Sequence, residues 1–298
     1  MFLFASEKDE QQFGQFAYEQ MLGGEGLKLR LAADYGQSEP DVNPEFLDVE
    51  TRSRALRASL TYPVIRSRKK NLYLGVGLDA VDQKVDLLGE RNSKDKLRVI
   101  HVNASYDFRD RFKGQSAMGL ELRQGLGFLG ASDKGDKKLS RDGGDPKFTS
   151  LNLYGSRYQA LFHRFGLYLA ARGQYAFDKL LNDELSRVGG ETFGRGYDPS
   201  ELSGDHGLGL SADLQYTENR PFGPLRGYQL YGFYDAGVVW NRGSDVEKRL
   251  SLASTGFGMQ IQFLDYFFVD LKLAWPLTRK PLTHDDDVRF LFQVTPRF

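Results

Sequence analysis

The sequence predicts an all-β protein, a transmembrane antiparallel β-barrel, and three observations lead to this prediction. Apolar and polar residues alternate with period two in segment after segment of about ten residues. No segment approaches the roughly 18 consecutive apolar residues of a membrane helix. The connections between the predicted strands are alternately short and long, which is typical of an up-and-down meander in an outer membrane.

The composition agrees with many half-buried strands. The 298 residues include 22 Phe, 15 Tyr, 2 Trp and 33 Gly, which is unusual for a soluble α/β enzyme. Because Cys is absent and only four His are present, disulfides and Cys-ligated zinc are excluded and we expect no metal or cofactor. The 40 Lys and Arg balance the 40 Asp and Glu, so the charge gives no general basic surface for nucleic acid.

The alternation places the strands along the chain. Between residues 208 and 216, Leu208, Leu210 and Leu214 share one face, whereas Ser211 and Asp213 share the other. The same reasoning predicts fourteen strands, at residues 1–6, 12–23, 26–37, 48–64, 71–87, 96–109, 115–129, 148–161, 166–178, 206–217, 225–240, 249–263, 266–277 and 288–298.

The connections between these strands fall into two sets. The short set comprises 24–25, 65–70, 110–114, 162–165, 218–224 and 264–265, and the long polar set comprises 7–11, 38–47, 88–95, 130–147, 179–205, 241–248 and 279–287. We therefore expect periplasmic turns at one end and extracellular loops at the other, with the sheet closed because open edges are costly in lipid. Apolar rows would face lipid and charged rows a hydrated lumen. A soluble sandwich also alternates, but it gives no reason for this sorting of connections.

Both ends of the chain carry an expectation. Residues 1–6 are too short for a membrane strand of about 9 to 11 residues and do not resemble a signal peptide, so we expect upstream sequence to be missing. Phe298 ends an apolar row, and a terminal aromatic of this kind is expected to be the signal that the barrel-assembly machinery reads.

The longest connection contains the most informative cluster, a glycine-rich stretch at 189–198. Asp235 falls on the polar face of its strand, where a carboxylate is costly unless it is hydrated or paired. Arg195 lies between Gly194 and Gly196, which would let the backbone approach the barrel wall closely. Arg195 is therefore the natural partner of Asp235 if this loop folds back into the lumen.

These residues resemble a known family. Arg195, Gly196 and Tyr197 are similar to the [VI]-R-G-[FY] tip of the inward-folded sixth loop in the outer-membrane assembly and secretion superfamily, with Gly194 where that family has Val or Ile. The segments 202–216 and 232–237 resemble two-partner secretion transporters of the haemolysin-activator (ShlB/FhaC/HecB) type.

The resemblance implies both fold and function. It implies a 16-stranded barrel that is truncated at the N-terminus, with residues 1–298 forming the barrel domain, 179–205 folding inward, and POTRA domains and signal peptide absent. The loop tip at Gly194, Arg195, Gly196 and Tyr197 would meet a wall segment containing Gly232, Asp235 and Gly237. The protein would be a monomeric pore that passes a large unfolded exoprotein to the cell surface. Its partners would be that exoprotein, outer-membrane lipid and the barrel-assembly machinery.

Three other functions are possible from the residues. A barrel-assembly factor of the surface-antigen branch and a passive porin would both show the same alternation. An enzyme has one foothold, because His101, Asn103 and Ser105 share a face. Neighbouring side chains in this row lie roughly 6.5 to 7 Å apart, which is already too far for a direct Ser to His hydrogen bond, so we expect no enzyme. Gly125, within a G-x-G-x-x-G match, is followed by no helix pattern and predicts no dinucleotide site.

Overall fold

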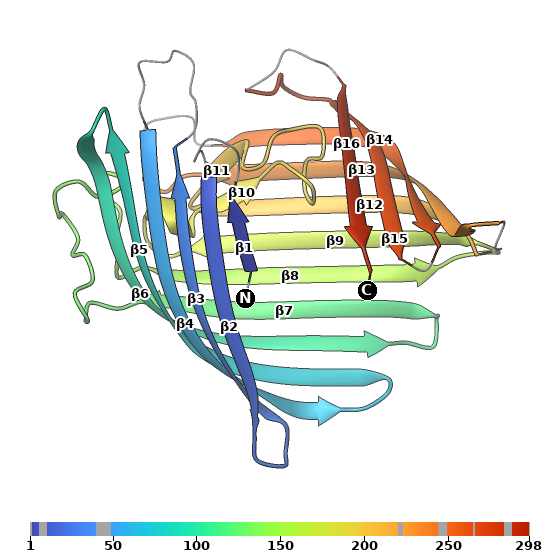
Figure 1. Ribbon diagram of the computed structural model, residues 1–298, viewed down its shortest axis with the longest axis horizontal. Coiled ribbons are helices and arrows are strands. Elements are labelled where there is room, and N and C mark those ends of the chain that lie inside the picture. Colours follow the sequence, from blue (N-terminus) through green and yellow to red (C-terminus); the bar gives the residue numbers. More distant parts are fainter. Residues whose placement is uncertain are drawn as a thin grey trace. The chain divides into compact units, whose positions relative to one another are not determined.

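The chain folds as a single meander of antiparallel strands. The computed structural model describes residues 2–5, 11–39, 49–219, 223–243, 249–264, 266–282 and 288–297. Fourteen strands form one sheet in chain order (Figure 1). They are β1 Phe2–Ala5, β2 Gln11–Leu22, β3 Leu27–Ser38, β4 Val49–Arg66, β5 Lys70–Leu87, β6 Glu90–Arg109, β7 Gly114–Gly125, β8 Thr149–Ala160, β9 Phe165–Ala176, β12 His206–Glu218, β13 Leu225–Trp240, β14 Leu250–Phe263, β15 Phe267–Pro276 and β16 Arg289–Pro296.

Three small elements lie between β9 and β12 in the chain. The strands β10, Ser186–Val188, and β11, Leu202–Gly204, pair with each other as a separate two-stranded sheet. A 3-10 turn, η2, covers Asn182–Glu184. No helix in the described part of the chain is long and apolar enough to cross a membrane.

The predicted strands match the observed ones closely, with two exceptions. The long loop predicted at 88–95 is wrong, because Leu88 and Gly89 alone join β5 to β6. Both have positive φ, 52° and 75°, which is the geometry that a two-residue hairpin turn requires. The strand predicted at 115–129 ends at Gly125, whose backbone N–H donates to Phe148 O at 2.8 Å.

The two faces of the strands differ in character. On β12, Leu208, Leu210 and Leu214 are 41%, 45% and 51% exposed, whereas Ser211 and Asp213 on the other face are buried. The same exposed apolar rows continue on β4 and β5, where Leu56 and Leu78 are 64% and 49% exposed. A surface with this many exposed large apolar side chains is what an outer-membrane strand presents to lipid.

The chain divides into two compact units. The first comprises Met1–Tyr106, Leu120–Asn152 and Ala176–Leu185, and the second comprises Asp107–Gly119, Leu153–Tyr175 and Ser186–Phe298. In the first unit, apolar residues of β4, β5 and β6 are covered by Phe148, Leu180 and Leu181, which are fully buried. In the second unit, Val188, Tyr197 and Leu202 of the long connection form a core with Val239 of β13 and Leu252 of β14. The part of the connection from Ser186 onward is therefore folded onto the sheet of its own unit.

Candidate functional site

The candidate site lies where the connection between β9 and β12 reaches the polar face of β12 and β13. The strands β10 and β11 contact β12 and β13 directly (Figure 1). Between β10 and β11, backbone hydrogen bonds close the chain into a compact tip, with Gly189 N donating to Phe193 O at 2.8 Å and Tyr197 N to Gly194 O at 2.9 Å. This tip presents Arg195 to the sheet.

Arg195 binds Asp235 through two parallel hydrogen bonds. Its Nε donates to Asp235 Oδ2 at 2.9 Å and its Nη2 donates to Asp235 Oδ1 at 2.7 Å. The backbone N–H of Arg195 also donates to Asp235 Oδ2 at 3.0 Å. The structure thus brings together the arginine and the aspartate that the sequence pairs, in the bidentate geometry that suits a guanidinium and a carboxylate.

A second carboxylate shares the same guanidinium. Nη2 of Arg195 donates to Asp213 Oδ1 at 2.6 Å and to Ser211 Oγ at 2.9 Å. The guanidinium carbon also lies 3.6 Å from the centroid of the Phe233 ring. We call Arg195, Ser211, Asp213, Phe233 and Asp235 the loop-tip cluster.

Asp213, Ser211 and Phe233 are absent from the predicted site. Asp213 and Ser211 share the polar face of their strand in the sequence pattern, which is the signal that could have pointed to them. Their contact with Arg195 depends on strand register, since Ser211 lies directly opposite Asp235 and Asp213 opposite Phe233. The sequence does not give that register.

The loop-tip cluster is buried and carries more negative than positive charge. The side chain of Arg195 is 7% exposed, and those of Asp213 and Asp235 are 12% and 0% exposed. Burial lowers the pKa of Arg195, but its hydrogen bonds to Asp235 and Asp213 outweigh this effect and raise the pKa above the ordinary arginine value. The guanidinium therefore stays charged, and one cation serves two carboxylates.

Gly194 and Gly196 permit the close approach of the tip. Gly194 has φ +113°, and a Cβ built there would lie 2.7 Å from Leu252 Cδ1. A Cβ on Gly196 would lie 2.8 Å from the backbone N of Pro276 and 2.9 Å from Ser254 Cβ. Any side chain at either position would have to displace the wall or the tip.

Tyr197 fixes the other side of the tip. Its side chain is fully buried, and its hydroxyl donates to Ala253 O at 3.1 Å. The same hydroxyl accepts from the backbone N–H groups of Thr278 and Arg279, each at 3.3 Å. Arg289 adds a hydrogen bond to Tyr197 O and an ion pair with Asp198 at 3.0 Å. All four predicted tip residues therefore contact the sheet or its edges.

The predicted wall glycines have different surroundings. A Cβ on Gly237 would lie 3.0 Å from Val188 Cβ, so Gly237 makes room for β10. Gly232 lies on the opposite face of β13, and the nearest atom to a Cβ there is Gly256 O at 3.9 Å. Gly232 is thus not a contact of the long connection, because period two turns its face away from Asp235. Phe298 lies outside the described residues.

His101, the histidine of the row that could have indicated an enzyme, is not placed as in a hydrolase. Nε2 of His101 lies 3.6 Å from Asp79 Oδ1, and Nδ1 lies 3.6 Å from Glu121 Oε2. Both ring nitrogens thus face carboxylates, whereas a hydrolase would aim one of them at a serine hydroxyl.

Comparison with known proteins points to one family. The family model described as "Haemolysin secretion/activation protein ShlB/FhaC/HecB" matches residues 33–261, which is well over half of the chain. This is a family of secretion transporters, not of enzymes. No curated protein sequence matches the chain.

Solved structures show the same fold at low sequence identity. CdiB from Escherichia coli matches with a TM-score of 0.81 and 16% identity, covering 95% of this chain and 52% of its own. CdiB from Acinetobacter baumannii has a TM-score of 0.71 and 18% identity, covering 95% of this chain and 50% of its own. BamA from Haemophilus ducreyi lacking POTRA domains 1–3 has a TM-score of 0.66 and 13% identity, and the match covers 96% of this chain and 62% of the BamA chain. The chain spans about half the length of the CdiB chains.

Proposed function

Since the chain belongs to the haemolysin secretion/activation protein family ShlB/FhaC/HecB, we propose that it is the membrane pore of a two-partner secretion transporter. Its place is the outer membrane of a Gram-negative bacterium. In this proposal residues 1–298 form the barrel domain of a longer transporter, and 179–205 fold into its lumen. The barrel passes a large unfolded exoprotein from the periplasm to the cell surface without bond chemistry.

One observation carries the proposal, namely the buried contact between Arg195 and the two carboxylates of β12 and β13. A charged loop tip that is seated on the polar face of the sheet occupies space that a translocating chain needs. Its contacts are few and specific, so the tip has one defined seated state. Secretion would require the tip to move between a seated state that organises the lumen and an unseated state that engagement of the exoprotein favours, so a tip that cannot stay seated would impair secretion.

The apolar face of the strands, which is opposite the polar face that carries the loop-tip cluster, also supports the proposed transporter. Many large apolar side chains there are 37% to 70% exposed on strands of both units, as for Leu56 at 64% and Leu214 at 51%. In the proposed barrel this face contacts lipid and the polar face surrounds a hydrated path. A porin would need only the hydrated path, and the loop-tip cluster would have no use in it.

Secretion by the complete transporter tests the proposal. The test uses cells that carry the full-length transporter gene and its exoprotein gene. It compares the original transporter with the Arg195→Ala variant and with a control variant, Arg66→Ala, which changes an exposed arginine at the end of β4. We expect Arg195→Ala to reduce exoprotein in the medium at least tenfold, while barrel abundance in the outer membrane and the levels of other barrels stay unchanged. Normal secretion by this variant, or a loss of all outer-membrane barrels, would contradict the proposal.

The orientation of the barrel is part of the proposal and has its own test. Lys138 lies in a long connection and His163 in a short one, and both are exposed. Because the chain has no cysteine, a single cysteine at either position labels only there. An impermeant thiol reagent added to intact cells should label position 138 and not position 163. The reverse pattern would show that the short turns face outward.

A further inference from the structure

On the apolar face of β4, β5 and β6, the side chains change from apolar to charged at neighbouring positions of the three strands. Leu56 of β4 lies opposite Ala80 of β5, and two residues further along, Arg54 lies opposite Asp82. On β6 the change comes at Arg98, which forms an ion pair with Asp82 at 2.8 Å. The charged row of the three strands therefore runs continuously along the edge of their apolar rows.

The length of β4 indicates where the change from apolar to charged side chains lies relative to the membrane. β4 has 18 residues, whereas about 9 to 11 suffice to cross a membrane. The apolar row of β4 begins near the short turn at 67–69 and ends at Leu56, so the remaining residues, from 49 to 55, continue beyond the hydrocarbon. The charged row thus marks the boundary between acyl chains and headgroups.

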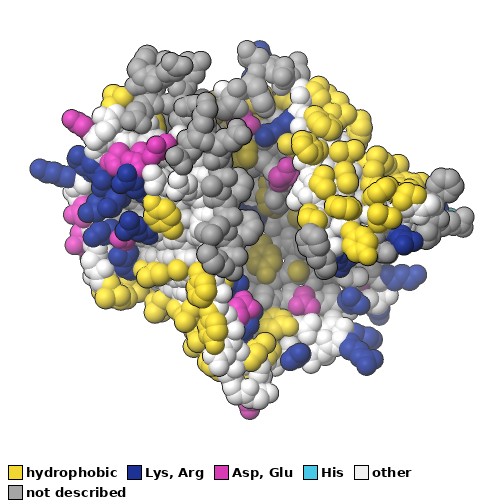
Figure 2. All heavy atoms as spheres, viewed as in Figure 1, with side chains coloured by type: hydrophobic (Ala, Val, Ile, Leu, Met, Phe, Trp, Pro, Cys, Tyr) yellow, Lys and Arg dark blue, Asp and Glu magenta, His cyan; other side chains and the backbone are white. Residues whose placement is uncertain are grey.

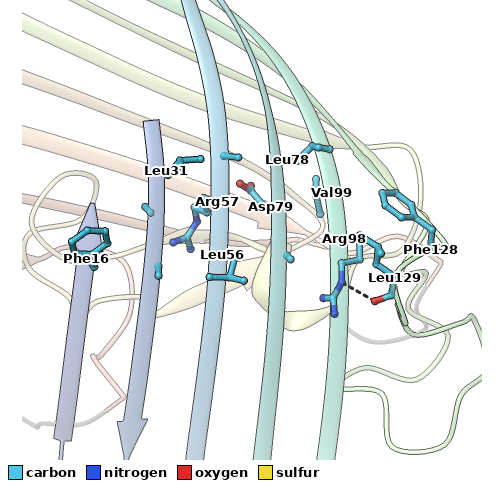
Figure 3. Close-up of a pocket in the computed structure, with 14 residues that line it drawn as sticks. Phe16, Leu31, Leu56, Arg57, Leu78, Asp79, Arg98, Val99, Phe128 and Leu129 are labelled. Carbon is cyan, nitrogen blue, oxygen red and sulfur yellow. Dashed lines mark hydrogen bonds between the residues drawn. The ribbon is translucent and has the colours of Figure 1, made fainter. Parts of the chain in front are cut away.

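An apolar pocket of about 410 Å³ lies directly beside this boundary (Figure 3). Its volume falls within the range of about 300 to 1000 Å³ that is usual for small-molecule sites. It is lined almost wholly by carbon, and it extends across neighbouring strands because alanines stand between larger residues. Its lining includes Phe16, Leu31, Leu56, Leu78, Ala58 and Ala80.

The segment after β7 closes one end of the pocket. Arg98 Nε donates to Leu129 O at 3.2 Å, and Leu126 N donates to Arg98 O at 2.7 Å, so this segment is held against β6. Phe128 and Leu129 line the pocket and are nevertheless 46% and 74% exposed. Two large apolar side chains held outward at this level are stable where lipid surrounds them.

The strand ends beyond the pocket carry slightly more positive than negative charge on their outer face, which has Arg52, Arg54, Lys84, Lys94, Lys96 and Arg98 against Glu50, Asp82, Asp86 and Glu90. Arg52 lies directly opposite Lys84 and forms an ion pair with Glu50, so Lys84 faces a cation that is already paired. Arg54, one row closer to the pocket, has its guanidinium 5.8 Å from the centroid of the Tyr35 ring. Figure 2 shows Lys and Arg side chains on the left of the view with Asp and Glu side chains among them, and hydrophobic side chains below.

We propose that this pocket and its cations bind one acyl lipid with a net anionic phosphate headgroup. An acyl chain occupies the pocket, and the phosphate lies between Arg54 and Lys84. These two residues are diagonal neighbours on adjacent strands, about 7 to 8 Å apart, which leaves room for a phosphate to contact both. The site shares no residue with the loop-tip cluster and depends only on placement in a membrane, so it does not rest on the secretion mechanism.

A lipid explains both halves of the site. A free phosphate ion would use the cations but would leave the apolar pocket without a function. A zwitterionic lipid would fill the pocket but would bring no net negative charge to Arg54 and Lys84. Only a molecule with both an acyl chain and a net negative headgroup matches the carbon lining and the charged row together.

Native mass spectrometry of the full chain, folded in uncharged detergent micelles, tests the proposal. The probes are palmitoyl-oleoyl phosphatidylglycerol, palmitoyl-oleoyl phosphatidylcholine and inorganic phosphate. We expect one tightly bound phosphatidylglycerol, with an affinity at least tenfold above that of phosphatidylcholine. Inorganic phosphate at equal concentration should not displace it.

Two variants and two matched controls assign the site. Arg54→Gln with Lys84→Gln should reduce phosphatidylglycerol affinity about tenfold or more, and so should Ala58→Phe, which fills the pocket. The controls are Arg66→Gln with Lys70→Gln at the other end of the same strands, and Leu74→Phe on the same apolar face. They should bind as the original chain does.

Three results would overturn the proposal. Equal affinity for the two lipids would mean ordinary lipid contact without a charge requirement. Equal losses in variants and controls would place the site elsewhere. Displacement by inorganic phosphate would indicate a simple anion site. Resistance of the folded chain to unfolding by cold dodecyl sulfate confirms that each variant is folded before it is compared.

Discussion

Replacing Arg195 by alanine removes the only cation that contacts Asp213 and Asp235 in the described loop-tip cluster. Asp235 is fully buried and Asp213 is 12% exposed at its side chain, so neither carboxylate regains full hydration while the tip stays seated. Two like charges then face each other in a poorly hydrated site. The perturbation acts on the seated state of the tip, and the strands themselves keep their pairing.

The size of the effect follows from the burial. Removing one partner of a buried ion pair costs about 3 to 5 kcal/mol, because the other partner is left uncompensated. Each 1.4 kcal/mol is a factor of ten, so the ratio of unseated to seated tip should rise by about 150- to 4000-fold. Asp235→Ala should cost less, since Arg195 keeps Asp213 at 2.6 Å. Arg195→Lys should recover part of the loss, because an ammonium cannot form both parallel hydrogen bonds.

Thiol labelling measures this ratio directly. Ser186 of β10 is 4% exposed and the chain contains no other cysteine, so Ser186→Cys reacts only when the tip and β10 leave the sheet. When opening and closing are fast, the labelling rate is proportional to the open fraction. We expect Arg195→Ala in this background to label at least a hundredfold faster, until the open state dominates. A cysteine at exposed Lys138 is the control and should react at one rate in all variants.

A double-mutant cycle separates a shared contact from two independent effects. If Arg195 and Asp235 act through one contact, Arg195→Ala combined with Asp235→Ala should label little faster than Arg195→Ala alone. If the two single effects simply add, or if Arg195→Ala labels at the original rate, the loop-tip cluster does not hold the tip and the reasoning is wrong.

Three further predictions concern other contacts. Gly237→Val should unseat β10 because a Cβ there lies 3.0 Å from the long connection, whereas Gly232→Val on the open face should not, and the same labelling assay compares them. Arg123 of β7 forms ion pairs with the buried carboxylates of Asp79 and Glu184, so Arg123→Met should lower the unfolding midpoint in denaturant by an amount equivalent to about 3 to 5 kcal/mol. Burial raises the pKa of Glu184, which Arg123 binds at 2.9 Å, so Glu184→Gln should cost less than Arg123→Met. Because the pKa of Glu184 is raised in the folded chain, the chain should lose stability as pH rises from about 4.5 through the raised pKa, and Glu184→Gln should lack that loss. Deleting Phe298 should reduce folded barrel in cells while leaving refolding in micelles unchanged, and equal loss in both settings would contradict its role as an assembly signal.

The sequence predicts strands well where one face contacts lipid. The strand predicted at 206–217 is observed as β12 at His206–Glu218, because Leu208, Leu210 and Leu214 make an unambiguous apolar row. The prediction fails between β5 and β6, where both faces are polar. There the strands extend beyond the apolar band and no longer need an apolar row, so their pattern is that of a loop.

The loop-tip cluster shows the same limit at the level of single residues. Asp235 could be assigned to the polar face from period two alone, and its pairing with Arg195 from the resemblance to a known tip motif. Asp213 could not, because its distance from Arg195 depends on how β12 and β13 are aligned. A shift of two residues would keep every side chain on its face and still replace Ser211 opposite Asp235 with another residue.

The tip uses two kinds of contact, and their division explains why a charged residue is present at all. Val188 and Leu202 pack on Val239 and Leu252, which supplies attraction without strict geometry. Apolar contacts of this kind tolerate small displacements, so by themselves they would leave the tip loosely placed. The bidentate contact between Arg195 and Asp235 tolerates none, because a shift of about 1 Å breaks both hydrogen bonds. A buried ion pair adds little net stability compared with apolar side chains, but losing it is costly. In the proposed transporter the tip would therefore have a seated state and an unseated state with few intermediates, which is the property that a gate requires.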